Sequence, residues 1–263
     1  MTGQEAPGLR APGEAAAAQP MSPGAPAIPQ LSIVLPVYNE GESVVPVLRG
    51  LSAGVRTPHE LIVVWDFDGD TTRPVVERLV PEIPGLRGLR NDLGRGVLKA
   101  MRAGIADARG EYILVSMADG SDEPRIVDGM VTLARDGADV VSASRYMRGG
   151  RQDGGPLIKR TLSRLAGLSL HWFAGVTTHD PTNNFKLYSR RFLDSITIES
   201  QAGFELALEL TVKATLAGRR VAELPTVWTD RAAGQSNFKL RAWLPHYLHW
   251  YRQAFVGRFR RAR

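Results

Sequence analysis

Acidic side chains gather at two places where an apolar run of the sequence has just ended. Asp66 and Asp68 follow the first of these runs. Asp119, Ser121 and Asp122 follow the second. Carboxylates accept hydrogen bonds from a base or a ribose, and they also bind hard cations such as Mg²⁺. We therefore expect nucleotide contact at the first group and a divalent metal beside a diphosphate at the second. The alternative for Asp122 is that it caps the helix after it.

Two further segments have residue types that suit a nucleotide. Asn39 and Glu40 end the first apolar run, where they can bind a base, ribose or phosphate or can cap the next helix. Asp70 is interpreted as a cap of this kind. Glycines in Gly94-Arg95-Gly96 precede another helix and would let backbone N–H groups approach phosphates, although a lone Gly-x-Gly is a weak motif.

Strands and helices that alternate in the first half of the chain are expected to position these residues. Strands are expected at 31–37, 61–65, 86–89, 112–117 and 139–143, and helices at 43–51, 71–80, 94–108 and 124–135. Short apolar strands alternating with helices predict an α/β domain whose mostly parallel sheet is flanked by helices. Ligands bind beyond the carboxyl ends of such strands, which is where the polar residues described above lie.

The second half has a different pattern and is expected to complete the pocket. Amphipathic or helical segments are predicted at 157–173, 204–216 and 240–256, with one or two strands at 221–228 around Pro225. Residues 1–30 are rich in Ala, Pro and Gly and are predicted to be a disordered tail. The expected organisation is this tail, a single catalytic domain at 31–240, and a basic, aromatic C-terminal segment at 241–263.

Charge and composition limit the classes of function. The chain has a net charge of +6, but eight positive charges and no acidic residue follow Asp230, so the remainder has a net charge of −2. A nucleic-acid partner is therefore not expected. Cysteine is absent, which excludes disulfides and thiolate metal sites. The longest apolar stretch, 162–176, is shorter than the roughly 20 residues of a membrane span, so a cytoplasmic protein is expected, placed at the inner face of the membrane.

The order of the motifs resembles that of family 2 glycosyltransferases, and most closely the polyprenyl- or dolichyl-phosphate mannosyltransferase branch. The motifs are Leu35-Pro36-Val37-Tyr38-Asn39-Glu40, Asp66 to Thr72, Gly94-Arg95-Gly96, Asp119, Ser144-Arg145-Tyr146 and Asp230-Arg231. They cover about residues 31–240. The resemblance implies a GT-A (Rossmann-like) fold and an inverting transfer of a hexose from a nucleotide diphosphate sugar.

The resemblance also implies which residues bind the donor. The expected nucleotide-sugar contacts are Pro36, Tyr38, Asn39, Glu40, Asp66, Asp68, Gly94, Arg95, Ala118, Asp119, Arg231 and Lys239. Asp119 and Arg231 are the expected catalytic residues, because Arg231 would neutralise the charge of the departing diphosphate.

The metal motif of the family is incomplete in this chain. Its Asp-x-Asp pattern reads Met117-Ala118-Asp119, so the first acid is missing. Mg²⁺ or Mn²⁺ often needs only one or two protein carboxylates, and we therefore expect Asp119 to hold it with Ser121 and Asp122. The alternative is a weakened dependence on metal.

The acceptor side of the resemblance is more complete. Arg145, Lys159 and Ser163 match the positions that meet an acceptor phosphate, for which the planar fork of an arginine is well suited. The expected acceptor is a polyprenyl phosphate. Two alternatives stay open: transfer to a saccharide hydroxyl in cell-envelope glycan synthesis, with Asp180 or Glu209 as the base, and a nucleotide-sugar-binding domain with little turnover.

The C-terminal segment combines aromatic and basic residues, including Trp243, Tyr247, Trp250 and Arg252. Such helices are typical of a membrane interface, and a peripheral membrane contact is predicted here. The alternative is that the aromatic residues pack against the domain.

Overall fold

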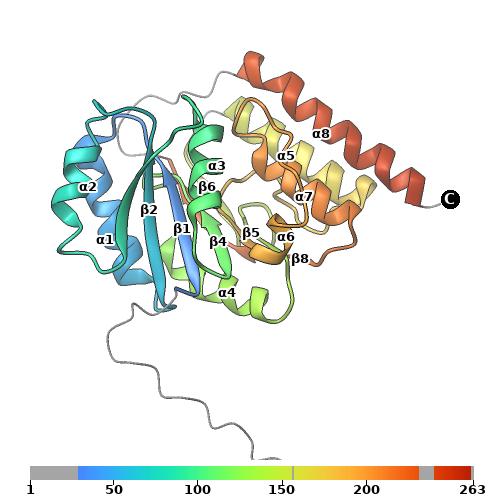
Figure 1. Ribbon diagram of the computed structural model, residues 1–263. Coiled ribbons are helices and arrows are strands. Elements are labelled where there is room, and N and C mark those ends of the chain that lie inside the picture. The colour runs from blue at the N-terminus through green and yellow to red at the C-terminus, as the bar shows by residue number, and fades with distance from the viewer. Residues whose placement is uncertain (1–28, 156, 231–239, 262–263) are drawn as a thin grey trace, which may run out of the picture.

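Parallel strands dominate the sheet of this protein, as the alternating sequence pattern predicts. In the computed structural model, which describes residues 29–155, 157–230 and 240–261, the strand order is β3-β2-β1-β4-β7-β5-β8 (Figure 1). The strands are β1 (Leu31–Pro36), β2 (His59–Trp65), β3 (Leu86–Arg90), β4 (Tyr112–Val115), β5 (Val140–Ser144), β7 (Lys186–Ser189) and β8 (Val221–Pro225). The α/β class and the mostly parallel sheet are thus confirmed.

Helices cover both faces of this sheet. One face packs against α1 (Val44–Gly54), α2 (Arg73–Leu79) and α4 (Val127–Arg135), and the other against α3 (Val97–Asp107), α6 (Arg190–Leu193) and α7 (Leu206–Leu216). Alternating side chains of β1 point to the two faces, as Leu35 packs with the first group and Val34 with the second. The central strands therefore contribute side chains to a hydrophobic core on each face of the sheet.

Strand β7 is the main departure from the predicted pattern. It lies between β4 and β5 and pairs antiparallel with both, so that Leu187 is opposite Leu114 on one side and Val141 on the other. The segment has only four residues and begins at Lys186, so its sequence does not have the apolar run that predicts a central strand. Without β7, strands β4 and β5 would not belong to one sheet.

The predicted strand at 221–228 forms two strands in two different sheets. β8 continues the main sheet, whereas β9 (Val227–Thr229) pairs in parallel with β6 (Arg151–Asp153). The chain crosses between the sheets at Thr226, whose N–H donates to the Ser144 carbonyl (3.1 Å). The small sheet lies beyond the carboxyl end of β5.

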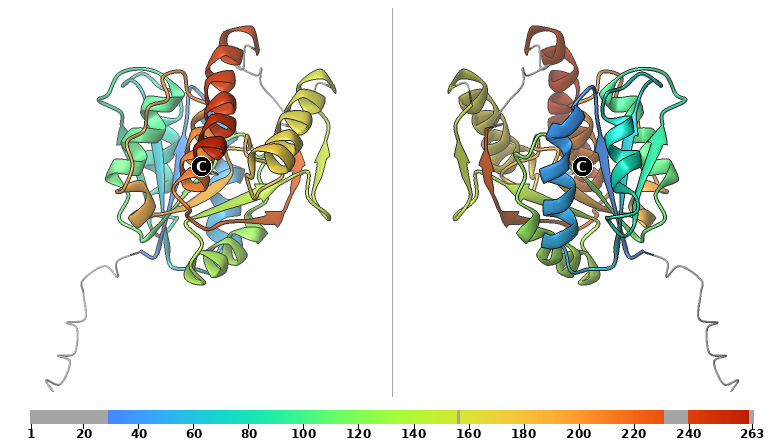
Figure 2. Two further views of the ribbon diagram at one scale, coloured as in Figure 1. Left: turned by 90° about the vertical axis from the view of Figure 1, so that its right-hand side faces the viewer. Right: turned by 90° about the vertical axis from the view of Figure 1, so that its left-hand side faces the viewer.

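The long helices α5 (Leu157–Ala174) and α8 (Leu240–Arg261) extend beyond the main sheet at one end of the molecule (Figure 2). Trp250 and Ala254 of α8 are buried against Leu170 of α5 and Val212 of α7. The C-terminal segment thus packs against the domain. The alternative considered for these aromatic residues therefore holds for Trp250.

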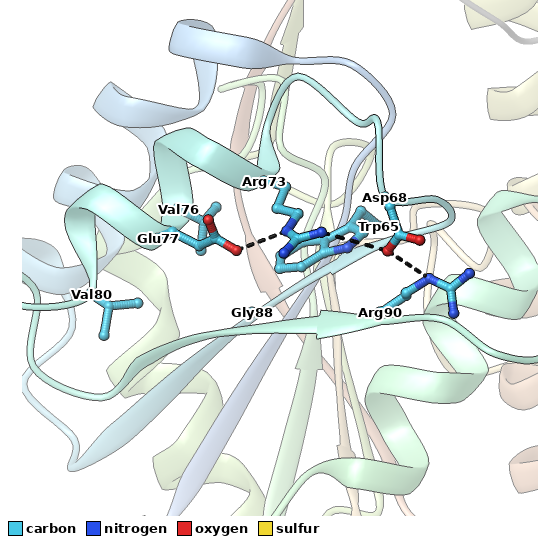
Figure 3. A pocket seen from close by; sticks show the side chains of 8 residues that line it. All are labelled: Trp65, Asp68, Arg73, Val76, Glu77, Val80, Gly88 and Arg90. Carbon is cyan, nitrogen blue, oxygen red and sulfur yellow. Dashed lines mark hydrogen bonds and ion pairs between the residues drawn. The ribbon is translucent and has the colours of Figure 1, made fainter.

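A tight contact between Trp65 and Gly88 holds the outer strands together. Figure 3 shows the Trp65 indole lying across Gly88, beside Arg73 and Arg90. A Cβ atom at position 88 would lie 2.2 Å from the indole ring, and the indole is only 7% exposed. Gly88 is therefore required by the packing of Trp65.

We expect Gly88→Ala to lower the free energy of unfolding by about 1–3 kcal/mol, because the buried indole would have to move. Denaturant unfolding followed by tryptophan fluorescence measures this change. The matched control is Gly50→Ala in α1, where an added Cβ meets nothing within 4 Å. That substitution should stabilise the helix by about 0.5–1 kcal/mol. Equal stability of the two variants would contradict the proposed contact.

Candidate active site

A cavity of about 1410 Å³ opens beyond the carboxyl ends of β1, β2, β4 and β5. Most of the residues that the sequence singles out line it: Pro36, Tyr38, Glu40, Asp66, Arg95, Ala118, Asp119, Ser121, Asp122, Arg145 and Ser163. The parallel strands bring these residues together although they are up to 127 positions apart. Their individual roles stay predictions. Arg231, Lys239 and the side chain of Lys159 lie outside the part of the chain that the structure describes.

Asp68, Asn39 and Gly94 do not line this cavity. The Asp70 N–H donates to the Phe67 carbonyl (3.2 Å), and this turn directs Asp68 to a separate pocket of about 320 Å³ beside β3. There its carboxylate lies 3.0 Å from Arg90 and 3.6 Å from Arg73 (Figure 3). Asp68 is thus an exposed partner of two arginines and does not face the same space as Asp66.

Asn39 and Asp70 connect the loops that follow β1 and β2. Asn39 has a left-handed backbone (φ 55°), and its side-chain oxygen accepts from the Thr71 N–H (3.1 Å). The Asp70 carboxylate accepts from the N–H groups of Thr72 (2.8 Å) and Asn39 (3.1 Å). Asp70 therefore orders the turn before α2 and does not cap the helix as predicted, because the N-cap of α2 is Thr72. Asn39 fixes the geometry of the same turn.

Asp66 holds the glycine-containing turn before α3. Its two oxygens accept from the Asn91 side-chain amide (2.8 Å) and from the Gly96 N–H (2.7 Å). The Asn91 amide also donates to the Gly94 carbonyl (2.6 Å). Each carboxylate oxygen keeps a second lone pair that can accept from a ligand. Asp66 is thus suited both to order this turn and to contact a base.

An aromatic and cationic group borders the same end of the cavity. The rings of Tyr38 and Phe67 lie 5.8 Å apart, and the Arg95 guanidinium lies 5.1 Å above the Phe67 ring. Tyr38 is 54% exposed, so its ring is available to a planar ligand.

The loop after β4 brings two carboxylates to the cavity. Asp119 accepts from the Ser121 N–H (3.1 Å) and hydroxyl (2.6 Å), while Asp122 accepts from the Met117 N–H (3.2 Å) and the Ser116 hydroxyl (3.1 Å). Burial and the neighbouring Asp119 carboxylate raise the pKa of Asp122 to about 7. Among the described residues, no group of three His, Cys, Asp or Glu side chains forms a complete metal site.

At the carboxyl end of β5, Arg145 forms a buried ion pair with Asp180. The Arg145 Nε and Nη2 atoms lie 2.7 and 2.9 Å from the two Asp180 oxygens, and the Asp180 side chain is completely buried. Although burial acts in the opposite direction on each group, their mutual attraction lowers the pKa of Asp180 and raises that of Arg145. Asp180 is thus an ionised partner of Arg145.

Lys186 lies behind this pair. Its ammonium group, which is fully buried, donates to the carbonyls of Asp180 (2.8 Å) and Asn183 (2.6 Å). Burial lowers the pKa of Lys186 to about 7, against the attraction of the Asp180 carboxylate. Lys186 therefore fixes the backbone of the turn that contains Asp180.

Glu209 is likewise committed to structure. Its oxygens accept from the N–H groups of Glu199 (2.6 Å) and Ser200 (2.8 Å), and Lys213 lies 2.8 Å away. The side chain is completely buried. Neither Asp180 nor Glu209 appears among the residues that line the cavity.

One arm of the cavity is apolar. It runs between α5 and α8 and is lined by Leu162, Leu165, Leu170, Leu244, Tyr247, Leu248 and Tyr251. The polar residues at the strand ends and this apolar arm belong to one continuous space. No helix within the described ranges is long and apolar enough to cross a membrane.

Comparison with known proteins places the chain in a family. The family model "Glycosyl transferase family 2" matches residues 32–197, which is more than half of the chain. The chain belongs to glycosyltransferase family 2. The expected enzyme class is thereby confirmed at the level of the family.

Two relatives of this family 2 glycosyltransferase have similar sequences. Dolichol-phosphate mannosyltransferase of Pyrococcus furiosus is 23% identical over 228 residues, which make up 85% of this chain and 63% of that protein. The chain thus spans less than two thirds of the length of this relative. Polyprenol monophosphomannose synthase of Mycolicibacterium smegmatis is 29% identical over 212 residues, which are 78% of this chain and 79% of that protein. Both relatives are consistent with the expected polyprenyl- or dolichyl-phosphate mannosyltransferase branch.

A solved structure has the same fold. Glucosyl-3-phosphoglycerate synthase from Mycobacterium tuberculosis, in complex with Mn²⁺, uridine diphosphate and glucosyl-3-phosphoglycerate, superimposes with a TM-score of 0.62. The identity is 18%, and the match covers 90% of this chain and 85% of that chain. This likeness confirms the expected GT-A fold.

Several residues of the cavity were not expected from the sequence as individuals. They are Gln152, Thr182, Asn183, Asn184 and Trp228. Gln152 and Trp228 come from β6 and β9, which are only three residues long and carry no periodic signal. Thr182, Asn183 and Asn184 precede the four-residue strand β7, where no periodic pattern indicates which side chains face inward.

Proposed function

We propose that this protein transfers a hexose, with inversion, from a nucleotide diphosphate sugar to a polyprenyl phosphate. The family supports the transfer, and the names of the two relatives support the lipid phosphate. The observation that carries the proposal is the state of the candidate bases. Asp180 is ion-paired to Arg145, Glu209 is held by two backbone N–H groups and Lys213, and neither lines the cavity, so neither is placed to deprotonate a sugar hydroxyl.

A phosphate acceptor does not need such a base. At neutral pH a phosphate monoester already carries a nucleophilic oxygen, so its attack is limited by positioning and by the charge of the leaving group. Arg145 and Ser163 line one side of the cavity and suit the phosphate, while the apolar arm between α5 and α8 suits a hydrocarbon tail. An acceptor that combines both features matches this space better than a polar saccharide.

In the proposed reaction an oxygen of the acceptor phosphate forms a bond to the anomeric carbon as the bond to the donor diphosphate breaks. The electron pair of the broken bond leaves with the nucleoside diphosphate, and the configuration inverts because attack is in line. Asp66 and Tyr38 would hold the nucleotide, and Asp119 would lie on the side of the diphosphate. Arg231 is proposed to approach the leaving group.

The residues around Asp119 fit a Mg²⁺ or Mn²⁺ ion that is held largely by substrate. Two carboxylates lie close enough for Asp119 to raise the pKa of Asp122, a repulsion that a cation would relieve. Such ions commonly use one or two protein carboxylates together with substrate phosphates. When bound, the metal would neutralise diphosphate charge. Met117 lines the wall where the family motif has a further acid.

The proposal is tested with the purified full chain, Mg²⁺ and labelled GDP-mannose or UDP-glucose. A short-chain polyprenyl phosphate is compared with the corresponding polyprenol and with an oligosaccharide. We expect labelled lipid only with the phosphate. Product on the oligosaccharide alone, or no product with any donor, would count against this function. If no donor gives product, nucleotide binding is measured and Met117→Asp is assayed for transfer. Binding of the nucleotide together with an inactive Met117→Asp variant would favour a nucleotide-sugar-binding domain.

We also propose that the protein contacts the membrane through α5. Of the described residues, Leu157, Leu165, Trp172 and Phe173 of this helix are each at least 60% exposed, although they are large and apolar. Arg160 and Arg164 lie on the same helix and suit anionic lipid headgroups. The helix also borders the apolar arm of the cavity, so a lipid acceptor would reach the phosphate site directly from the bilayer.

We expect Trp172→Glu and Phe173→Glu each to weaken binding to vesicles of phosphatidylcholine and phosphatidylglycerol by about tenfold or more. The reason is that each side chain would lose its apolar contact with lipid, worth roughly 1.5–3 kcal/mol. Sedimentation with the vesicles measures the bound fraction. The matched control is Val80→Glu, an exposed apolar residue that follows α2. Equal loss in all three variants would contradict the role of α5.

A further inference from the structure

Two hydroxyl groups and a guanidinium converge on one point of the cavity wall. Ser163 Oγ of α5 lies 2.7 Å from Thr182 Oγ1, and Arg145 Nη2 lies 3.5 Å from Ser163 Oγ. All three side chains line the cavity. The sequence motifs had pointed to Arg145 and Ser163 for an acceptor phosphate, but not to Thr182.

Thr182 is held in this place by a turn that the surrounding residues fix. Its hydroxyl donates a long hydrogen bond to Asp180 Oδ1 (3.4 Å), and the Asp180 N–H donates to the Thr178 hydroxyl (3.1 Å). The Lys186 ammonium holds the carbonyls on either side, those of Asp180 and Asn183. The turn is thus tied at each end, so the Thr182 hydroxyl is preorganised toward the cavity.

The position of Thr182 is also tied to that of Arg145. Asp180 binds the Arg145 guanidinium with both carboxylate oxygens and lies near the Thr182 hydroxyl. One buried carboxylate therefore orients two donors that come from different segments, one after β5 and one before β7. Donors that converge from separate elements onto one cavity point are the arrangement that binds a phosphate group.

We propose that Thr182 is a further binding residue for the acceptor phosphate, to which its hydroxyl donates a hydrogen bond beside Ser163 and Arg145. The inference rests on the proposed function for the identity of the acceptor. Each hydroxyl has one proton and can rotate, so the Ser163–Thr182 hydrogen bond and the long Thr182–Asp180 bond can be exchanged for one bond from each hydroxyl to a phosphate oxygen. A phosphate monoester offers three such oxygens, enough for all three donors.

Thr182→Val tests this because it removes the hydroxyl and keeps the shape of the side chain. We expect the affinity for citronellyl phosphate, measured by calorimetry on the full chain, to fall by about tenfold to 100-fold, as is typical for a hydrogen bond to a charged group. In the transfer assay the acceptor KM should rise by a similar factor, with the donor KM unchanged. Thr182→Ser retains the hydroxyl and should bind within about threefold of the wild type.

The matched control is Thr132→Val on α4, where an exposed threonine hydroxyl donates to the Asp128 carbonyl far from the cavity. Melting curves identify any variant that is not folded, and Thr182→Ala then replaces Thr182→Val. If Thr182→Val binds citronellyl phosphate as tightly as Thr132→Val, the inference is overturned. Weak binding by Thr182→Ser would overturn it as well, since the hydroxyl is then not the cause.

The binding measurement separates this inference from the proposed function. If the wild type transfers sugar to the lipid phosphate but Thr182→Val does not change acceptor affinity, only the inference fails. If no donor gives labelled lipid, yet the wild type binds citronellyl phosphate more tightly than citronellol and Thr182→Val abolishes the difference, the phosphate site stands without the proposed reaction.

Discussion

Replacing Asp119 with Asn is expected to reduce the rate of transfer from the nucleotide sugar by about 10³-fold or more. The carboxylate lies in the loop after β4 and lines the cavity, where the proposed diphosphate and its cation would lie. Loss of the negative charge would weaken the hold on the cation, and stabilisation of a leaving group by such a charge is worth several kcal/mol. The measurement is kcat/KM for the nucleotide sugar, with saturating acceptor and at two concentrations of Mn²⁺.

The amide of Asn keeps an oxygen that can accept from Ser121, so the loop should remain folded. The melting temperature of Asp119→Asn should therefore stay close to that of the wild type. Asp92→Asn provides the control, because Asp92 is exposed and its carboxylate pairs with the exposed Arg90. A kcat/KM for Asp119→Asn within threefold of this control would rule out the assigned role.

Replacing Arg145 with Ala should lower the free energy of unfolding by about 3–5 kcal/mol. The substitution leaves the completely buried Asp180 carboxylate without its guanidinium partner, and an uncompensated buried charge is strongly destabilising. Acceptor binding should be lost at the same time. Urea denaturation at pH 7 measures the first effect, and Arg151→Ala, which removes an exposed arginine paired to Asp153, is the control with an expected change below about 1 kcal/mol.

The pH dependence of stability gives a second test of this ion pair. The pKa of Asp180 is lowered in the folded protein, so its contribution is present above the ordinary pKa of about 3.9 and is lost as the pH falls toward the lowered value. The stability difference between the wild type and Arg145→Ala should therefore shrink below about pH 4. A difference that does not depend on pH would mean that the two groups are not an ion pair.

Much of the fold and of the cavity lining beyond β1, β2 and β4 could be predicted because the relevant sequence patterns are local. Strands β1, β2 and β4 are each a largely apolar run followed by polar residues, so one local pattern predicts both the strand and the residues beyond its carboxyl end. Asp66 and Asp119 line the cavity for this reason. Parallel strands with right-handed crossovers bring their ends to one edge, which converts sequence order into proximity.

The rest depends on contacts between residues far apart in sequence. Asp180 precedes a four-residue strand that has no periodic signal, and its partner Arg145 is 35 positions earlier, so nothing local indicates a buried ion pair. Asp68 has the same residue type and nearly the same position as Asp66, and only the turn closed by Asp70 sends it to the other pocket. Exposure of α5 likewise depends on which helices pack beside it.

The insertion of β7 between β4 and β5 sets the separation of the proposed donor and acceptor sites. Asp119 follows β4 and Arg145 follows β5, and these strands are joined only through the ladder that each makes with β7. Neighbouring strands lie about 4.8 Å apart, so the two ends are held roughly 10 Å from each other by backbone hydrogen bonds. The distance between the proposed donor and acceptor sites is thus fixed by the sheet. Variants selected for bulkier lipids should accordingly carry changes along α5 and α8 and leave this spacing untouched.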